Sequence, residues 1–384
     1  MIAVALGLGT AAVWAYVLTG RGFFWLARPR DAAAVTPPRT WPPVAVIVPA
    51  RDEADVIAAA VASLLQQDYP GDVRVMVVDD DSTDDTAAIA RDAAARLDVA
   101  GLDVLHGAPP PPGWTGKLWA MSQGVGRAAR RDPKPVYLLF TDADIAHAPD
   151  NLRRLVSRAE AGGLSLTSLM VELHCTTWAE RLLIPAFVMF FQMVYPFAWV
   201  NRPGRPLAAA AGGCMLVRRD ALEAAGGLAA IRGALIDDCA LAARMKRQGP
   251  IWLGHSRHAR SLRPYRTVGE IGRMVSRSAF AQLDYSALRL AGTLAGLLVT
   301  FLLPPVLAIA GHGPARLAGL AAWGAMACAF QPTLALYRRS PLWGVALPLI
   351  GALYALFTVQ SAVQVWRGRG GLWKGRAQAL ARPA

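Results

Sequence analysis

Acidic residues form three short clusters of the kind that can bind a metal ion or a polar ligand. They are Asp79-Asp80-Asp81, the pair Asp142 and Asp144, and the pair Asp237-Asp238. The first two directly follow the apolar runs Val73–Val78 and Val136–Phe140, which predict buried parallel strands. Side chains at the carboxyl ends of such strands reach the crevice where open α/β sheets bind ligands. Converging carboxylates repel one another, so we expect a divalent cation between them, Mg²⁺ or Mn²⁺, together with a diphosphate.

Helix capping is the structural alternative for some of these acids. Asp84 and Asp85 lie where a helix is expected to begin, at Thr83, and we interpret them as caps. Asp80, Asp142 and Asp144 together are better explained by a ligand site.

A nucleotide diphosphate gives each remaining acid a role. Asp79 and Asp80 can accept hydrogen bonds from a base and a ribose, and Asp142-x-Asp144 can place the metal ion against the diphosphate. Lys117 follows a Gly-containing loop and can contact a phosphate or the base. Such cations stabilise the charge on a departing diphosphate.

Transfer to a hydroxyl also needs a base, and Asp238 is our candidate. It lies about 90 residues after Asp144, at the start of a helix expected at Cys239–Gln248. The alternative is that Asp237-Asp238 only caps this helix. The first strand ends in Pro49-Ala50-Arg51-Asp52-Glu53 rather than in G-x-G-x-x-G, which argues against a dinucleotide oxidoreductase.

Alternating strands and helices must position these side chains. The expected elements run strand, helix, strand, helix and strand, then a Pro-Gly loop, a helix and the strand before Asp142. The ranges are Val44–Val48, Asp55–Gln66, Val73–Val78, Thr83–Arg96, Leu102–Leu105, Pro109–Gly113 and Leu118–Ala129. This order predicts an α/β fold with a doubly wound, mostly parallel sheet.

The rest of the chain has the composition of a membrane protein. Hydrophobic residues make up 54% of the 384 residues, and the mean hydropathy is +0.32. We expect an N-terminal anchor at 1–20, a Pro-rich linker at 28–43, a catalytic domain at 44–285, a membrane region at 290–366 and a basic tail at 367–384. Residues 182–200 are expected to form helices in the membrane interface, with a buried core helix as the alternative.

The net charge of +13 does not indicate nucleic acid, because many cations flank the apolar segments. Arginines follow the first span, which predicts an outside N-terminus and a cytoplasmic domain. Three later spans, Leu290–Ala310, Ala318–Leu336 and Leu342–Trp366, would then leave the basic tail outside. We therefore expect either a re-entrant Leu290–Ala310, broken at Pro304-Pro305, or an exception to the positive-inside rule.

In series, these motifs resemble the inverting family 2 glycosyltransferases of GT-A fold. The motifs are Ala50-Arg51-Asp52-Glu53, Val77–Ser82, Thr141–Asp144, Gly212-Gly213-Cys214 and Asp237-Asp238. More narrowly, the chain resembles the hopene-associated glycosyltransferases of bacteria that make hopanoids. That likeness rests on Pro112–Lys117, Ile236–Leu241, Arg263-Pro264-Tyr265 and Trp373–Arg376.

The resemblance implies roles for particular residues. Arg51 and Glu53 would lie beside the nucleoside and Asp80 on the base or ribose. Asp144 would be the metal ligand and Asp238 the base. It also implies a UDP-sugar or similar donor, a lipid acceptor and a place in the bacterial inner membrane.

One departure from the family concerns polymer formation. Processive members carry Q-x-x-R-W, and this chain has only Met274-Val275-Ser276-Arg277, so Arg277 is a candidate diphosphate contact and transfer of one sugar is favoured. Two alternatives stay open. One is a polyprenyl-phosphate sugar transferase, whose acceptor phosphate would need Arg257, Arg260, Arg263 and Arg266. The other is a non-catalytic member of a lipid-modifying complex.

Overall fold

The computed structural model describes residues 1–27, 35–370, 372–373 and 376–377. Residues 28–34 of the expected linker, and residues 371, 374–375 and 378–384 of the expected tail, lie outside this description. The chain divides into two compact units. The sheet unit contains Pro29–His174, Val200–Arg263 and Gly371–Ala384, and the helical unit contains Met1–Arg28, Cys175–Trp199 and Pro264–Gly370. In this division residues 182–199 and 264–285 of the expected domain at 44–285 belong to the helical unit, and Val200 belongs to the sheet unit.

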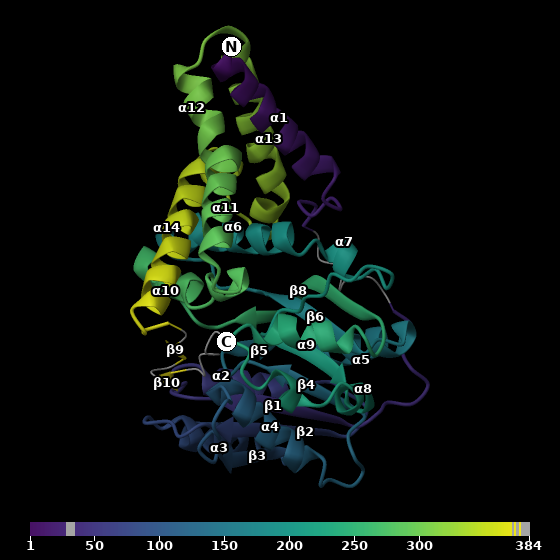
Figure 1. Cartoon of the computed structure of the whole chain (residues 1–384). Helices are drawn as coiled ribbons and strands as arrows, with labels where there is room; N and C mark the ends of the chain where they lie inside the picture. The colour runs from purple at the N-terminus through teal and green to yellow at the C-terminus, as the bar shows by residue number, and fades with distance from the viewer. Residues whose placement is uncertain (28–34, 371, 374–375, 378–384) are drawn as a thin grey trace. The chain divides into compact units, whose positions relative to one another are not determined.

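An eight-stranded sheet, in the order β3-β2-β1-β4-β7-β6-β8-β5, forms the centre of the sheet unit (Figure 1). Its strands are β1 Val44–Ala50, β2 Val73–Asp79, β3 Leu102–His106, β4 Tyr137–Thr141, β5 Ile145–His147, β6 Leu166–Glu172, β7 Cys214–Arg218 and β8 Ile251–Ser261. β1, β2, β3 and β4 run parallel, as do β6 and β8, whereas β7 is antiparallel to both of its neighbours and β5 is antiparallel to β8. The predicted mostly parallel α/β sheet is confirmed. A short antiparallel pair, β9 Leu372–Trp373 and β10 Arg376–Ala377, lies apart from it.

Helices cover both faces of β1, which is buried along its whole length. Val46 and Val48 pack in one core with α2 residues such as Ile57. Ile47 points to the opposite face, where a Cβ on Gly124 of α4 would meet it at 2.5 Å, so glycine allows this close approach. The helices of this unit are α2 Ile57–Leu65, α3 Thr86–Leu97, α4 Gly116–Ala128, α5 Asn151–Gly162, α8 Arg219–Ala224, the 3₁₀ turn η1 Leu228–Ile231 and α9 Asp237–Met245. The short α7, Phe197–Val200, spans the boundary between the units.

The helical unit contains the long apolar helices. Its elements are α1 Ile2–Thr19, α6 Trp178–Val194, α10 Val268–Ser276, η2 Ala281–Leu283, α11 Ala287–Leu297, η3 Leu298–Leu302, α12 Leu303–Ala310, α13 Gly313–Leu336, η4 Pro341–Ala346 and α14 Leu347–Trp366. Within the described residues, five stretches are long and apolar enough to cross a bilayer: Ile2–Thr19, Trp178–Val200, Ala287–Ala310, Gly313–Leu336 and Pro341–Trp366. More than half of the Trp178–Val200 stretch is buried within the protein.

The prolines at 304 and 305 do not break their helix as expected. Residues Ala287–Ala310 form one helical run in which the π-helical turn η3 precedes the prolines. Proline has no N–H to donate to the preceding turn. The free carbonyls of this turn are bound instead by α1, because Trp14 Nε1 donates to Thr300 O at 2.7 Å and Thr10 Oγ1 donates to Val299 O at 2.9 Å.

Candidate active site

The carboxyl ends of three neighbouring strands bring the predicted motifs to one edge of the sheet. Ala50 at the end of β1 pairs with Asp79 at the end of β2, and Asp80 N donates to Ala50 O at 2.8 Å. Thr141 at the end of β4 pairs with Cys214 at the start of β7. Asp142 and the Gly212-Gly213 segment therefore lie on adjacent strands.

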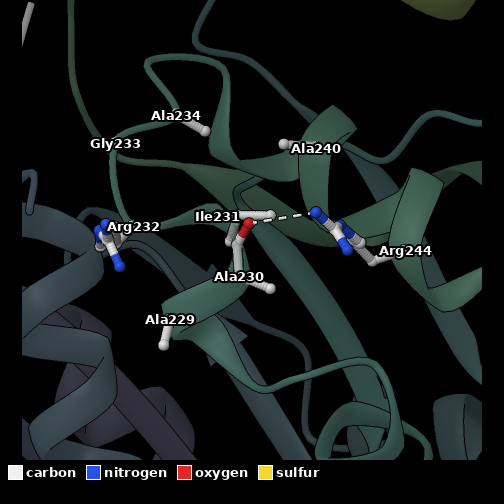
Figure 2. A pocket seen from close by; sticks show the side chains of 8 residues that line it. All are labelled: Ala229, Ala230, Ile231, Arg232, Gly233, Ala234, Ala240 and Arg244. Atoms are coloured by element: carbon white, nitrogen blue, oxygen red, sulfur yellow. Dashed lines mark hydrogen bonds between the residues drawn. The ribbon is translucent and has the colours of Figure 1, made fainter. Parts of the chain in front are cut away.

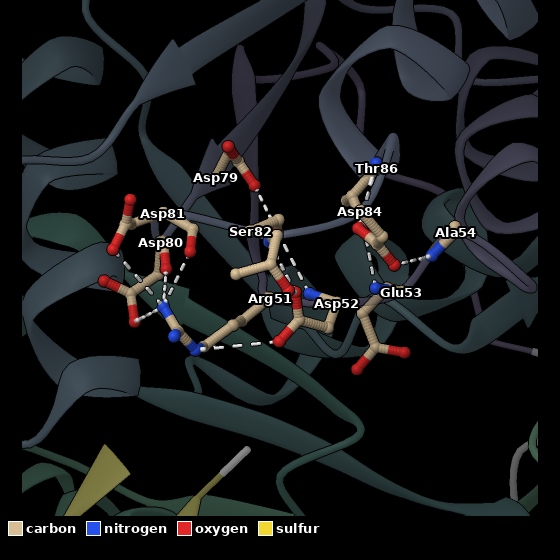
Figure 3. A network of polar contacts seen from close by, with 11 residues as sticks. Arg51, Asp52, Glu53, Ala54, Asp79, Asp80, Asp81, Ser82, Asp84 and Thr86 are labelled. Atoms are coloured by element: carbon tan, nitrogen blue, oxygen red, sulfur yellow. Dashed lines mark hydrogen bonds and ion pairs between the residues drawn. The ribbon is translucent and has the colours of Figure 1, made fainter. Parts of the chain in front are cut away.

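Arg51 organises the first acidic cluster (Figure 3). Its Nη1 donates to the carbonyl of Asp80 and, at 2.9 Å, to that of Asp81, and lies 4.0 Å from the Asp80 carboxylate. The Asp80 residue is only 1% exposed, so this carboxylate lies beside a fixed positive charge inside the fold. Asp79 is also buried and accepts a hydrogen bond from Ser82 Oγ. The loop after β2 is thereby held in one shape.

Asp84 and Asp85 differ from one another in the structure. Asp84 accepts hydrogen bonds from the backbone N–H groups of Thr86 and Ala54, both at 3.1 Å, so it caps α3 and links it to the loop after β1. Burial raises the pKa of Asp84, but the hydrogen bonds from Thr86 and Ala54 outweigh it and the net pKa is lowered. Asp85 precedes α3 without a side-chain cap bond. The helix begins at Thr86 rather than Thr83, because Asp81 adopts a left-handed conformation at φ 55° and the turn takes up three further residues.

Lys117 joins the second and third acidic clusters. It lies in the first turn of α4, whose N-cap Thr115 accepts from Leu118 N at 3.3 Å. Its Nζ is 2.9 Å from Asp142 Oδ1 and 3.3 Å from Asp237 Oδ2. Burial lowers the pKa of Lys117, but attraction to the two acids outweighs it and raises the pKa overall. Lys117 is therefore a permanent cation between two acids that come from different elements.

Asp238, the candidate base, accepts two backbone hydrogen bonds and has a raised pKa. Its Oδ2 accepts from Gly212 N at 2.9 Å and its Oδ1 from Cys239 N at 2.7 Å. Burial and the neighbouring Asp237 raise the pKa of Asp238 to about 6, against the opposing effect of Lys117 and of the two N–H donors. A carboxylate with this pKa is ionised at neutral pH and still accepts a proton well. Asp237-Asp238 opens α9, two residues earlier than expected.

Arg263 makes a connection that the sequence did not reveal. Its Nε donates to Asp144 Oδ2 at 3.1 Å, and its Nη2 pairs with Glu53. Ser261 Oγ also donates to Asp144 Oδ2, at 3.3 Å. Arg263 was expected only as a contact for an acceptor phosphate or as part of a family motif. It lies 119 residues from Asp144 in the chain, and only the antiparallel pairing of β5 with β8 makes them neighbours.

Arg277 belongs to a different unit of the chain from the acidic clusters. It follows α10 in the helical unit, whereas the other predicted site residues belong to the sheet unit. Its assignment as a diphosphate contact stays a prediction.

The donor set at 142 and 144 fits a hard divalent cation. No group of three or more His, Cys, Asp or Glu side chains arranged to hold a metal occurs within the described residues. The contacts given above use Oδ1 of Asp142 and Oδ2 of Asp144, so each carboxylate has a second oxygen for a cation. Burial raises the pKa of Asp142, and the negative charge of Asp144 adds to this in opposition to Lys117. A cation would relieve that repulsion, with its further ligands from a diphosphate and water.

A shallow pocket lies beside α9, the helix that begins with the acidic pair (Figure 2). It has a volume of about 660 Å³ and is lined by Ala229, Ala230, Ile231, Arg232, Gly233, Ala234, Ala240 and Arg244. Arg244 Nη2 donates to Ala230 O at 3.5 Å, and Thr115 N donates to Arg232 O at 2.9 Å. The pocket wall is thus connected to the loop that carries Lys117.

Comparisons with known proteins agree with this geometry. Residues 45–226 match the family model Glycosyl transferase family 2. This stretch is thus similar to the family that the resemblance predicted, and the GT-A-like fold is confirmed. The mannosyltransferase PcManGT from Pyrobaculum calidifontis, solved with GDP-Man and Mn²⁺, has a similar fold. The superposition of the two structures has a TM-score of 0.56 at 21% sequence identity and covers 95% of this chain and 99% of the mannosyltransferase chain.

Two curated relatives share part of the sequence. The 4,4'-diaponeurosporenoate glycosyltransferase of Staphylococcus aureus (strain MRSA252) is 34% identical over 119 residues, which are 31% of this chain and 28% of that protein. Succinoglycan biosynthesis protein ExoO of Rhizobium meliloti (strain 1021) is 35% identical over 126 residues, 33% of this chain and 32% of that protein. The chain thus matches about a third of the length of these relatives.

Proposed function

We propose that this protein is an inverting glycosyltransferase that moves one sugar from a nucleotide diphosphate sugar to a hydroxyl of a membrane lipid. The observation that carries the proposal is the meeting of Asp142, Lys117, Asp237 and Asp238 at one edge of the sheet. It provides a base, a fixed cation and metal-type ligands within one group of contacts. The family match supports the same reaction class.

The donor half of the site would be formed by the loops after β1 and β2. Asp79 and Asp80 would accept hydrogen bonds from the base and ribose, and Arg51 and Glu53 would lie beside the nucleoside. Arg51 holds the Asp80–Asp81 backbone in place before any donor arrives, so little ordering is left for binding. UDP is the nucleotide we favour.

Asp142 and Asp144 would hold Mg²⁺ or Mn²⁺, which when bound would neutralise charge on the departing diphosphate. In the transfer itself, Asp238 would take the proton of the acceptor hydroxyl while the oxygen of that hydroxyl attacks the anomeric carbon of the donor sugar. The bond from that carbon to the diphosphate oxygen breaks, and its electron pair leaves with the nucleoside diphosphate. One displacement inverts the anomeric carbon. Lys117 would hold Asp142 and Asp237 in place through its two ion pairs.

A lipid acceptor agrees with the five apolar stretches in the part of the chain that the structure describes. A polar donor from the cytosol and an acceptor that stays in the bilayer require a site at the membrane surface. We propose the bacterial inner membrane, with the sheet unit cytoplasmic and residues 182–200 near the interface. Within this class, the motif likeness described above favours a hopanoid-like acceptor.

A second candidate function is transfer to a polyprenyl phosphate. The pocket beside α9 favours it, because Arg232 and Arg244 are the charged residues of its lining and both are cationic. A phosphate bound there would lie next to the helix of the proposed base.

Purified protein with a panel of nucleotide sugars and lipids tests the main proposal. Release of one nucleoside diphosphate per lipid glycoside, with the anomeric configuration inverted, is expected for a hydroxyl acceptor. Retention of configuration, or no release with any donor, would contradict it. Preference for phosphorylated lipids, lost in Arg232→Gln and Arg244→Gln, would favour the second candidate.

A further inference from the structure

A chain of buried polar groups runs from α5 to the Gly212-Gly213 segment. Asn151 Nδ2 lies 2.7 Å from His147 Nδ1, and His147 Nε2 lies 2.9 Å from Thr141 Oγ1. Thr141 Oγ1 in turn donates to Gly213 O at 2.9 Å. Asn151 and Thr141 are each 1% exposed and His147 is 5% exposed, so water does not replace these contacts.

The protons of this chain fit one arrangement. The Asn151 amide nitrogen can only donate, so His147 Nδ1 accepts, and a neutral ring then carries its proton on Nε2. Burial lowers the pKa of His147 to about 4, which keeps the ring neutral at physiological pH. His147 therefore donates to Thr141, whose own proton is left for the Gly213 carbonyl. If the oxygen and nitrogen of the Asn151 amide were exchanged, the direction of every hydrogen bond in the series would be exchanged too. The Gly213 carbonyl would then lose the Thr141 hydroxyl as its donor.

This series of hydrogen bonds ends beside Asp238, the proposed base. Gly212 N–H, one residue before the held carbonyl, donates to Asp238 Oδ2 at 2.9 Å. A Cβ on Gly212 would lie 3.4 Å from both Asp238 Oδ2 and Lys117 Nζ, which shows how closely the backbone approaches both groups. Thr141 directly precedes Asp142, the other partner of Lys117. One hydroxyl thus connects the strand end that carries Asp142 to the segment that contacts Asp238.

We propose that His147, acting through Thr141, is a positioning residue that holds Gly212-Gly213 so that the Gly212 N–H stabilises the ionised form of Asp238. This inference rests on the proposed role of Asp238 as the base. It assigns catalytic importance to three buried residues, His147, Thr141 and Asn151, that would act through other residues. A neutral histidine suits the task because it both accepts and donates, and so fixes the direction of the hydrogen bonds.

The pH profile separates this role from a merely structural one. The charged groups that act on Asp238 are Asp237, which raises its pKa, and Lys117, which lowers it. Neither is altered by a substitution at 141. Loss of the Gly212 hydrogen bond destabilises the carboxylate, so the pKa of Asp238 rises. Protonated Asp238 cannot act as a base. The acid limb of the pH profile, where kcat falls as the pH drops, therefore moves to higher pH.

The test compares Thr141→Val with two controls. Thr141→Ser keeps the hydroxyl. Thr167→Val removes another buried hydroxyl of the same sheet, one with no hydrogen-bond partner within the described residues. We expect Thr141→Val to shift the acid limb upward by about one pH unit, so that kcat falls about tenfold at pH 5 but only about twofold at pH 7, with the donor KM unchanged. Both controls should keep the wild-type acid limb. His147→Phe should repeat the effect of Thr141→Val.

A second measurement does not need turnover. Infrared titration follows the protonated carboxyl band of Asp238, identified by its loss in Asp238→Asn. The midpoint should rise in Thr141→Val and stay unchanged in Thr141→Ser and Thr167→Val. An unchanged midpoint in folded Thr141→Val would overturn the positioning role. A raised midpoint in a protein that transfers no sugar would uphold the positioning role and reject the proposed function.

Discussion

The acids after β2 are held mainly by their own loop and its neighbour, whereas the acids after β4 and in α9 are held by side chains from distant parts of the chain. Asp79 is bound by Ser82, three residues away. Asp142 and Asp237, by contrast, share Lys117, which lies on a third element. The shape of the first region is therefore set locally, and the second region depends on the whole fold and on the balance of its charges.

This difference orders the expected effects of substitutions. Changes in the second region should affect both chemistry and stability, and changes in the first should affect donor binding or the local helix only.

Asp144→Asn is expected to have the largest effect on activity. It removes a negative oxygen ligand for the metal ion but keeps the shape of the side chain, so transfer should fall to background while the fold is retained. Activity assays and circular dichroism check this. Asp220→Asn, which changes an exposed acid paired with Arg218, is the control and should stay active. Full activity of Asp144→Asn, or of the wild type in excess EDTA, would reject the metal assignment.

Lys117→Met should cost both activity and stability. The change leaves Asp142 and Asp237 without their shared cation. Because these side chains are partly exposed, we expect a loss of about 1–3 kcal/mol, between the values for exposed and for fully buried ion pairs. Chemical unfolding measures the loss, with the exposed Lys134→Met as the matched control. The double variant Lys117→Met with Asp142→Asn should recover part of the stability, since it removes one of the unpaired charges. No recovery would mean that the pairing is not the source of the effect.

Arg51→Gln should act on donor affinity. The change loosens the carbonyls of Asp80 and Asp81, so we expect the donor KM to rise about tenfold with a smaller change in kcat. Arg91→Gln on the exposed face of α3 is the control. A drop in kcat with unchanged KM would place Arg51 in the chemical step and remove the contrast between the two regions.

Asp84→Ala should have the smallest effect. Loss of the cap on α3 is expected to lower the free energy of unfolding by about 1 kcal/mol, and transfer should be unchanged. Asp85→Ala is the comparison and should be nearly neutral, because Asp85 makes no side-chain cap bond. Equal losses in the two variants would contradict the assignment of the cap to Asp84.

Local pattern was enough to predict β1, β2, β3 and β4 and the placement of the first two clusters, but not the later strands β5, β6, β7 and β8. The apolar runs before Asp79 and Asp142 form β2 and β4, because short β-branched runs pack as buried strands whatever lies far away in sequence. Element boundaries were less exact. The left-handed residue Asp81 delays α3, and a backbone conformation of this kind has little signal in the sequence.

Long-range pairing could not be predicted in the same way. Arg263 contacts Asp144 and Glu53 only because β8 returns beside β5. The hydrogen-bonded series from Asn151 to Gly213 forms only once β4, β5, α5 and β7 are assembled. His147 and Asn151 could have been noticed as polar residues four apart next to Asp144, but nothing in that spacing indicates Gly213. Topology, not composition, determines these neighbours.

The most direct test of the account is the pH dependence of transfer in the wild type, Asp238→Asn and Asp237→Asn. We expect wild-type kcat to fall as the pH drops below about 6, because Asp238 must be ionised to take the acceptor proton. Asp238→Asn should still bind the donor, lose this acid limb and transfer roughly 10²–10⁴ times more slowly. Asp237→Asn should be milder, with its acid limb at lower pH, because removing the neighbouring charge lowers the pKa of Asp238. An active Asp238→Asn with an unchanged acid limb would contradict the account.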